Sequence, residues 1–223
     1  MKKSLLFLFL LCFSLSVKAQ SSCPDNNHPH MIDLGLPSGT LWACCNVGAS
    51  SPEDYGGYYA WGETETKSDY DYTNYAYGND EYSQNIGENI AGTQYDVAHV
   101  KWGGSWRMPS KEQFEELTNN CTSMWITMNR TTGRLFIGHN GRSLFLPAKK
   151  YGPSDDDYSE FYWSSTLYKD NNWSYFLFIW PEGAVCEMRH PRYNGHSVRP
   201  VCPPKKDDMD KYIDILIEGL FGF

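Results

Sequence analysis

Apolar positions recur with a helical period in one well-defined stretch in the middle of this chain, residues 111–119. Phe114 and Leu117 are three residues apart, so they fall on one face of a helix and are expected to pack inward. Ser110 directly precedes the stretch, and Gln113 lies three residues after Ser110, which is the spacing of a capping box. The pattern therefore predicts a helix over residues 111–119.

Beyond residue 120 the apolar positions alternate, which is typical of β-strands. The sequence RLFIGHNGRSLFL, residues 134–146, predicts a hairpin whose Asn140 and Gly141 suit a tight primed turn. In WSYFLFIW, residues 173–180, both alternating sets are apolar, so this strand is expected to be covered on both faces. Further strands are predicted over residues 161–168, 184–189 and 196–202.

The other segments have weaker patterns. Residues 31–62 are typical of short strands joined by Pro, Gly and Ser turns. Residues 63–95 are polar and tyrosine-rich without a helical period, which indicates a long surface insertion, and residues 94–102 have room for one or two helical turns. The elements together predict an α+β fold, with short helices packed on one antiparallel sheet that carries the C-terminal half.

The start of the chain has the features of a cleaved secretory signal. Two lysines precede a thirteen-residue apolar run that is too short to span a bilayer, and small residues follow it. We expect residues 1–19 to be a signal peptide and the protein to be secreted or held at the cell surface, with lipidation as a lesser alternative. An N-terminal segment, residues 20–30, then precedes a single domain over residues 31–202.

The last part of the chain, residues 203–223, is predicted to be a linker followed by an amphipathic helix. Its apolar positions have i, i+3 and i+4 spacing. This helix is expected to dock on the domain, or alternatively to meet a partner.

Composition narrows the class of partner. Removal of the signal peptide takes away three lysines and no acid, so the net charge of −8 becomes −11. Such an acidic chain is poorly suited to nucleic acid or anionic lipid, and no transmembrane segment is expected. Aromatic residues make up 16% of the chain, more than one core needs, so some rings are expected on a binding surface.

Six cysteines remain after cleavage, an even number that favours disulfides in an exported chain. We predict the pairs Cys45–Cys121 and Cys186–Cys202, with buried free thiols as the alternative for some of the six. No Cys/His pair has the spacing of a zinc site, and HPH, residues 28–30, has a proline between its imidazoles. The sequence thus predicts neither a metal site nor a cofactor.

Six blocks of sequence occur in an order that resembles a known family of exported bacterial proteins. They are DLGLPSGTLWACCNVGA, YAWGET, DVAHVKWGGSWRMPSKEQFEEL, GHNGRSLFLPA, YWSST and HSVRPV. Over roughly residues 32–201 they resemble the Fibrobacter succinogenes major paralogous domain family, which implies a C-type-lectin-like fold. That fold is shared with formylglycine-generating enzymes and with the ligand-binding variable proteins of diversity-generating retroelements. The chain departs from the pattern at Cys44, where Thr or Ser is expected, and in its C-terminal helix.

The candidate ligand-binding residues lie in two loops that mix amides, cations and rings, a composition suited to adaptable recognition. In the retroelement variable proteins the ligand surface lies in this C-terminal part of the fold, so the resemblance points to the same loops. The predicted ligand-binding residues are Tyr168, Asn171, Asn172, Trp173, Arg192 and Tyr193. The tyrosine-rich insertion is a second candidate surface.

The sequence WGGSWRMPS, residues 102–110, is interpreted as scaffold that braces the sheet. Its two tryptophans are expected to be apolar anchors, its arginine to satisfy nearby carbonyls or a carboxylate, and its Pro-Ser pair to fix the start of the helix. Arg199, near the C-terminus, is also expected to be buried and structural. The predicted structural residues are Trp102, Trp106, Arg107, Pro109, Ser110 and Arg199.

Catalytic signatures are weak, so we expect no enzymatic activity. The cysteine pair of formylglycine-generating enzymes, the HxxxHxE helix of the related sulfoxide synthases and a nucleophile elbow are all missing from the sequence. The tripeptides of calcium-dependent lectins are missing too. Residues 154–158 contain carboxylates, so whether a calcium ion binds this loop stays open.

The sequence predicts an exported, non-catalytic protein that binds an extracellular protein or glycan through the C-terminal loops of its domain. The first alternative is a structural subunit of a surface or fimbrial assembly, with the C-terminal helix as the assembly element. An enzyme of the formylglycine-generating type is the less favoured alternative. The oligomeric state stays open.

Overall fold

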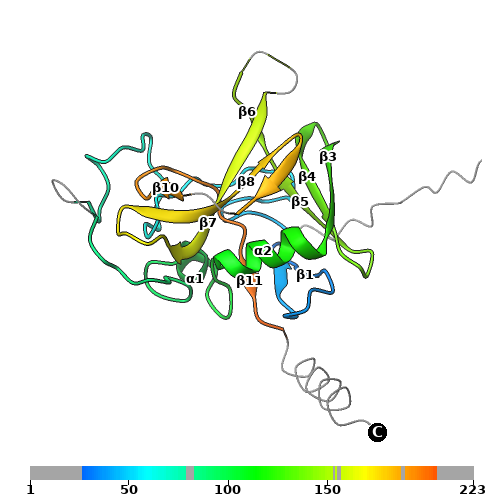
Figure 1. Cartoon of the computed structure of the whole chain (residues 1–223), viewed down its shortest axis with the longest axis horizontal. Coiled ribbons are helices and arrows are strands. Elements are labelled where there is room, and N and C mark those ends of the chain that lie inside the picture. The colour runs from blue at the N-terminus through cyan, green and yellow to red at the C-terminus, as the bar shows by residue number, and fades with distance from the viewer. Residues whose placement is uncertain (1–26, 79–82, 153, 155–156, 187–188, 205–223) are drawn as a thin grey trace, which may run out of the picture.

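The structure is a computed structural model that describes residues 27–78, 83–152, 154, 157–186 and 189–204. The predicted signal peptide and C-terminal helix lie outside these residues, as do two of the residues in the 154–158 loop. The described part contains two short helices and a series of antiparallel strands (Figure 1). The elements are β1 (Met31–Asp33), β2 (Leu41–Ala43), α1 (Val97–Trp102), α2 (Lys111–Asn120), β3 (Thr122–Met128), β4 (Thr131–Ile137), β5 (Ser143–Pro147), β6 (Lys149–Lys150), β7 (Tyr158–Leu167), β8 (Trp173–Trp180), β9 (Gly183–Val185), β10 (Arg189–Pro191) and β11 (Val201–Cys202).

The strands form three sheets. The largest has the order β10-β8-β7-β6, with β9 paired to β8; a second has the order β3-β4-β5, and a small third has the order β1-β2-β11. The prediction of one sheet for the C-terminal half is therefore wrong. Strand β5 ends at Pro147, the N–H of Ala148 still donates to the carbonyl of Thr132 on β4 at 2.8 Å, and Lys149 then pairs with Ser159 on β7. Antiparallel sheets with two short helices are compatible with an α+β or a mainly β class.

Helix α2 confirms the predicted helix and its cap. The Ser110 side chain accepts a hydrogen bond from the backbone N–H of Gln113, and the Gln113 side chain accepts one from the N–H of Ser110. Phe114 and Leu117 are fully buried, as the helical spacing predicted. The helix ends one residue later than predicted, at Asn120. The predicted helical turns over residues 94–102 are also present, as α1.

The hairpin between β4 and β5 is present, but its turn differs from the predicted one. Gly141 has a φ of 79°, whereas Asn140 does not adopt a positive φ, as both central residues of a primed turn would. The N–H of Gly141 donates to the carbonyl of Gly138, and the N–H of Gly138 donates to the carbonyl of Arg142. The loop is therefore longer than two residues, and within it only Gly141 adopts the left-handed conformation.

The core consists of two apolar clusters, and β8 contributes to both. Leu177 and Ile179 pack in a cluster with Trp42 and Phe114, where the two rings lie 5.5 Å apart. Phe176 faces a second cluster that includes buried residues from the N-terminal half of the chain. The prediction that this strand is covered on both faces is confirmed.

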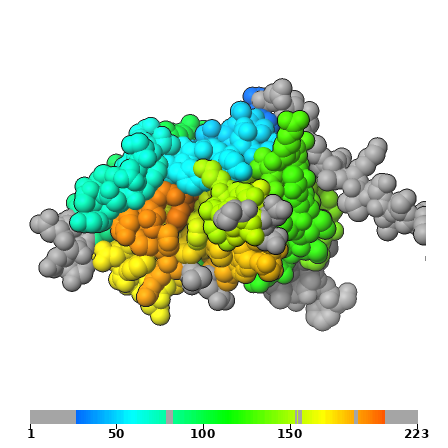
Figure 2. Space-filling view, turned by 90° about the horizontal axis from the view of Figure 1, so that it is seen from above, coloured from blue at the N-terminus to red at the C-terminus, as the bar shows by residue number. Residues whose placement is uncertain are grey.

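Residues 63–95 form no helix or strand in their described part, as predicted, yet they are tied closely to the C-terminal strands. The N–H of Trp61, just before the segment, donates to the carbonyl of Arg192 at 2.8 Å, and the N–H of Ile90 donates to the carbonyl of Ser165 at 3.0 Å. Figure 2 shows the teal residues near 63–78 lying directly against the orange residues near 189–200. This segment is thus part of the domain body.

The corner at residues 102–110 makes packing and main-chain contacts that link it to other parts of the domain. Trp102 and Trp106 meet edge to face at 5.5 Å. Arg107 contributes through its backbone, which exchanges two hydrogen bonds of 2.9 Å with Val201, and Pro109 accepts one of 2.7 Å from the N–H of Ser165. The corner therefore joins α2 to β7 and β11.

Arg199 is a buried structural residue, as predicted. It is fully buried, its Nε donates to Oδ1 of Asn46 at 2.7 Å, and its Nη1 donates to the carbonyls of Ala43 and Cys44. The guanidinium group thereby satisfies the backbone of the turn that follows β2.

The predicted disulfides Cys45–Cys121 and Cys186–Cys202 are wrong, because no cysteine pair among the described residues lies at disulfide distance. The described residues include five cysteines. Cys121, at the end of α2, is half-buried, and the other four are buried. An even cysteine count carries no information on geometry, and a disulfide needs Cβ atoms about 3.8 Å apart.

Candidate ligand pocket

A pocket of about 380 Å³ opens beside the turn that joins β7 to β8. Two segments far apart in the sequence form it, the β7–β8 turn and residues 85–88. The lining combines two phenol rings, two amides, one carboxylate, one ammonium group and a hydroxyl. The lining residues are Asn85, Glu88, Thr166, Leu167, Tyr168, Lys169, Asn171 and Tyr175.

Backbone hydrogen bonds hold the two segments together. The N–H of Leu167 donates to the carbonyl of Glu88 at 2.8 Å, and the N–H of Tyr168 donates to the carbonyl of Trp173 at 2.9 Å, closing the turn. Asn172 accepts a 2.7 Å hydrogen bond from the N–H of Ser83 through its Oδ1. The walls of the pocket are therefore fixed mainly by main-chain contacts. Among the lining side chains, Oδ1 of Asn85 accepts from the N–H of Gly87 at 2.8 Å, and Oγ1 of Thr166 accepts from the N–H of Lys111 at 3.1 Å.

Aromatic rings and cations lie close together on one side of the pocket. The rings of Tyr168 and Tyr175 lie 5.1 Å apart. The guanidinium carbon of Arg189 lies 5.2 Å from the ring of Tyr168 and 5.2 Å from that of Trp173, and Nζ of Lys111 lies 5.2 Å from the ring of Tyr175. Each cation is within the range of a favourable cation–π contact, so the rings are held in place before any ligand arrives.

Arg192 lies below this surface, so its predicted contact with ligand is wrong. It is fully buried, and its Nη1 donates to the carbonyls of Gln84 and Asn171 at 2.8 and 2.6 Å. Its guanidinium carbon lies 4.5 Å from the ring of Trp61, and burial lowers the pKa of the group. Arg192 therefore links the two segments of the pocket, and the loop composition could not distinguish this role from exposure.

The other predicted ligand-binding residues occupy different places. Tyr168 and Asn171 line the pocket. Trp173 is half-buried on β8 against Arg189, and the side chain of Asn172 is engaged with Ser83. Tyr193 is half-buried and lies outside the pocket lining.

The sequence reasoning missed the lining residues Asn85 and Glu88, which come from the tyrosine-rich insertion. They have no local signal, because they reach the pocket only through the pairing of Glu88 with Leu167. Tyr175 was missed for a different reason. Its position in an apolar strand indicated core, whereas the structure leaves it half-exposed.

Two histidines, His190 on β10 and His196 after it, pack against each other. Nδ1 of His190 lies 2.7 Å from Nε2 of His196, and the ring of Phe161 is stacked on both imidazoles. Burial lowers the pKa of His190. It also lowers that of His196 well below the usual value, where the neighbouring His190 adds to the effect. These imidazoles serve the packing of the second core cluster.

Three comparisons, with protein-family models, with curated proteins and with solved structures, find no match to this chain. Within the described residues, neither helix has the length and apolar character needed to cross a membrane.

Proposed function

We propose that this protein is an exported, non-catalytic binding protein that recognises an extracellular glycan through the pocket beside the β7–β8 turn. The observation that carries the proposal is the pair of adjoining rings, Tyr168 and Tyr175, whose centres lie 5.1 Å apart, in a pocket that also presents Asn85, Asn171 and Glu88. The C-type-lectin-like fold belongs to the same proposal, and the antiparallel sheets with two short helices are compatible with it.

The chemistry of the pocket suits a neutral saccharide. The face of a phenol ring packs against the C–H groups of a sugar, while amide and carboxylate oxygens accept hydrogen bonds from its hydroxyl groups. A volume of about 380 Å³ lies in the usual range for small-ligand pockets. The net charge of −8 disfavours acidic polymers, and Lys169 and Glu88 give the pocket charges of both signs.

A glycan array and a protein array, both probed with the chain lacking residues 1–19, test this proposal. We expect binding to a defined set of neutral glycans. Replacing Tyr168 or Asn171 with Ala should weaken binding to the best glycan at least tenfold in isothermal titration, which corresponds to about 1.4 kcal/mol. The matched control is Tyr72→Ala, because Tyr72 is an exposed tyrosine outside the pocket lining.

Circular dichroism of each variant should match the wild type, since Tyr168 and Asn171 are not core residues. Glycan binding that is equal in the wild type and in Tyr168→Ala would place recognition elsewhere. Selective capture on the protein array, with no glycan bound, would replace the proposed ligand class with a protein.

A further inference from the structure

Three metal-ligating side chains lie together near the beginning of the described chain. One ligand atom each from His28, Cys44 and Cys45 falls within 4.8 Å of the other two. Nδ1 of His28 is 3.0 Å from Sγ of Cys44. The cysteines are buried and His28 is half-buried, so the group is shielded from solvent without being closed.

The pairing of β1 with β2 builds this cluster. Met31 lies opposite Ala43, and the pairing continues outward, since the N–H of Cys44 donates to the carbonyl of His30 at 3.0 Å. The segment before β1 is thereby laid over the two cysteines that follow β2. His28 and Cys44 are sixteen positions apart, which explains why sequence spacing indicated no site.

We propose that His28, Cys44 and Cys45 bind a thiophilic metal ion, and that this ion is Zn²⁺. Two thiolates and an imidazole are the ligands that Zn²⁺ prefers, in tetrahedral sites with Zn–S near 2.3 Å and Zn–N near 2.0–2.1 Å. Binding converts each cysteine thiol to a thiolate and releases its proton to solvent, so two Zn–S bonds form at the cost of two S–H bonds. Carboxylate-binding ions such as Mg²⁺ and Ca²⁺ are disfavoured by this set.

His30 is placed to complete the coordination. Its Nδ1 lies 3.7 Å from Sγ of Cys44, and its ring meets that of His28 edge to face at 5.1 Å. His30 is therefore the residue near the cluster that we propose as a fourth ligand, after a rotation of its imidazole.

Groups around the ligands favour the thiolate form. The backbone N–H of His30 donates to Sγ of Cys44 at 3.0 Å. The buried guanidinium of Arg199 donates to the carbonyl of Cys44 at 2.8 Å, which brings a positive charge to the same turn. Hydrogen bonds to sulfur and nearby cations both stabilise a thiolate, and contacts of this kind orient and tune metal ligands.

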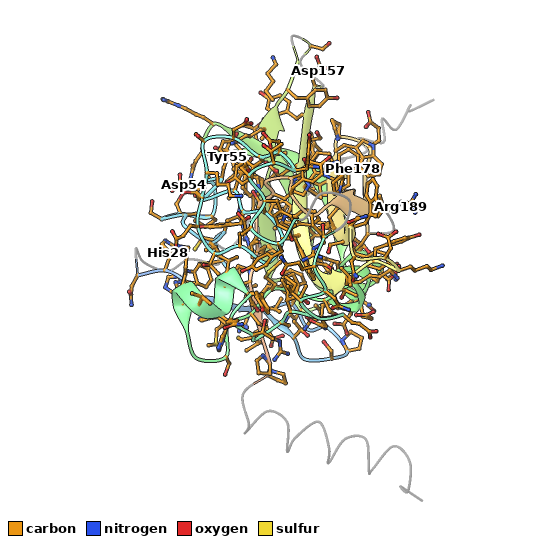
Figure 3. All side chains as sticks on the ribbon, turned by 90° about the vertical axis from the view of Figure 1, so that its left-hand side faces the viewer. His28, Asp54, Tyr55, Asp157, Phe178 and Arg189 are labelled. Carbon is orange, nitrogen blue, oxygen red and sulfur yellow. The ribbon has the colours of Figure 1, made fainter. Side chains whose placement is uncertain are left out.

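The bound ion would join the segment before β1 to the turn after β2, so it would act as a structural clamp at the small β1-β2-β11 sheet. Figure 3 places His28 and Arg189, the latter beside the ligand pocket, toward opposite sides of the molecule. The metal site is therefore independent of the proposed glycan binding.

The test uses the chain lacking residues 1–19, reduced and stripped of metal under nitrogen. Equilibrium dialysis against Zn²⁺, read by elemental analysis, should give one tightly bound ion per chain. Co²⁺ in its place should give thiolate-to-metal charge transfer and the intense d–d bands of tetrahedral coordination. Added Zn²⁺ should raise the melting temperature, because the ion binds the folded state.

Cys45→Ser and His28→Ala should each raise the dissociation constant for Zn²⁺ by more than about tenfold and weaken the cobalt spectrum. Because His28 is half-buried on a segment outside the strands, its variant keeps the test valid if the cysteine variant unfolds. The matched controls are Cys121→Ser and His99→Ala, which change the same residue types outside the cluster.

The proposal is overturned by any of three results. The reduced chain could bind no stoichiometric Zn²⁺ or Co²⁺. The variants at His28 and Cys45 could bind as tightly as the controls. Mass mapping of the protein recovered from its own host could show Cys44 or Cys45 in a disulfide, which would take away the thiolates that the site requires.

Discussion

The β3-β4-β5 sheet differs from the irregular segment, defined as residues 44–78 and 83–95, in two ways. The two regions pair their backbone N–H and C=O groups differently, and they contribute differently to the buried core. The sheet is regular, and its hydrogen bonds are its own, yet no residue of β3 is fully buried. The irregular segment has no helix or strand, yet it supplies much of the second core cluster. Its buried members in that cluster are Val47, Tyr59, Trp61 and Ile90.

The irregular segment depends on side chains to hold a backbone that no ladder supports. Nε1 of Trp61 donates to the carbonyl of Ser164 at 2.8 Å, and the hydroxyl of Tyr75 donates to the carbonyl of Trp61 at 2.6 Å. In the opposite direction, Nε1 of Trp163 on β7 donates to the carbonyl of Tyr59. A buried carbonyl without a partner costs free energy, so these aromatic donors combine packing with satisfaction of the backbone. Stability in this region is thus concentrated in a few large side chains.

The largest expected difference between the regions comes from comparing Trp61→Ala with Trp125→Ala. Trp61 is fully buried and loses its packing, its hydrogen bond and its contact with Arg192, so unfolding free energy should fall by about 3–5 kcal/mol. Trp125, on β3, is half-buried and lies 5.6 Å from the Arg134 guanidinium, so its loss should cost about 1–2 kcal/mol.

Urea denaturation of both variants, followed by fluorescence of the remaining tryptophans, measures the two values. Equal losses would contradict the view that the irregular segment concentrates its stability in single side chains. Proteolysis of Trp61→Ala should also begin within residues 63–95, because local opening precedes global unfolding there.

The second comparison uses Glu160, where the irregular segment meets β7. Oε2 of Glu160 accepts a 2.6 Å hydrogen bond from the Tyr58 hydroxyl, and burial raises the pKa of the carboxyl to about 7 even though this bond opposes the shift. The folded protein therefore keeps a proton that the unfolded chain releases near pH 4.5. The stability contributed by Glu160 is complete below pH 4.5 and is lost as pH rises to 7.

Glu160→Gln should remove this dependence. The free energy of unfolding of the variant minus that of the wild type should rise by about 2–3 kcal/mol between pH 4.5 and pH 8. Urea denaturation of both proteins at each pH measures this difference. The histidines His190 and His196 act in the opposite direction, since their lowered pKa values destabilise the fold as pH falls through 6.5, but they cancel in this difference. The exposed Glu182→Gln serves as control, and an equal gain in that variant would exclude burial as the cause.

The smallest expected effect lies in the regular sheet, at Gly141→Ala in the β4–β5 turn. No atom lies within 4 Å of the added methyl group, so the cost arises only from the φ of +79° and should be about 1 kcal/mol. Gly138→Ala in the same loop should cost more, because its methyl group would collide with the carbonyl of Leu34. Thermal melts of both variants give the order, and a larger loss at Gly141 would contradict it.

Much of the regular structure could be predicted because its causes are local. The capping box of Ser110 and Gln113 and the alternation in residues 134–146 and 173–180 each lie within about a dozen residues. Where the prediction was wrong, the cause was not local. The turn at Asn140 depends on loop length. The division of the strands into separate sheets depends on the chain changing its pairing partner from β4 to β7 after Ala148.

The candidate site was only half predictable. Loop composition indicated Tyr168 and Asn171 as candidates, and the structure places both in the pocket lining. Arg192 has the same composition around it and is buried instead, because the carbonyls of Gln84 and Asn171 provide its partners. A backbone carbonyl is present in every residue type, so such a partnership leaves no mark on the sequence.

By itself, the sequence determined helix α2 with its cap, the long strands β4, β5, β7 and β8, and the structural burial of Arg199. Only the tertiary structure decided which loops form the pocket, where Arg192 lies, and that His28 meets Cys44 and Cys45. The physical reason is the range of the interactions. Periodicity and capping act within a few turns of chain, whereas each of these sites depends on contacts between segments that are distant in the sequence.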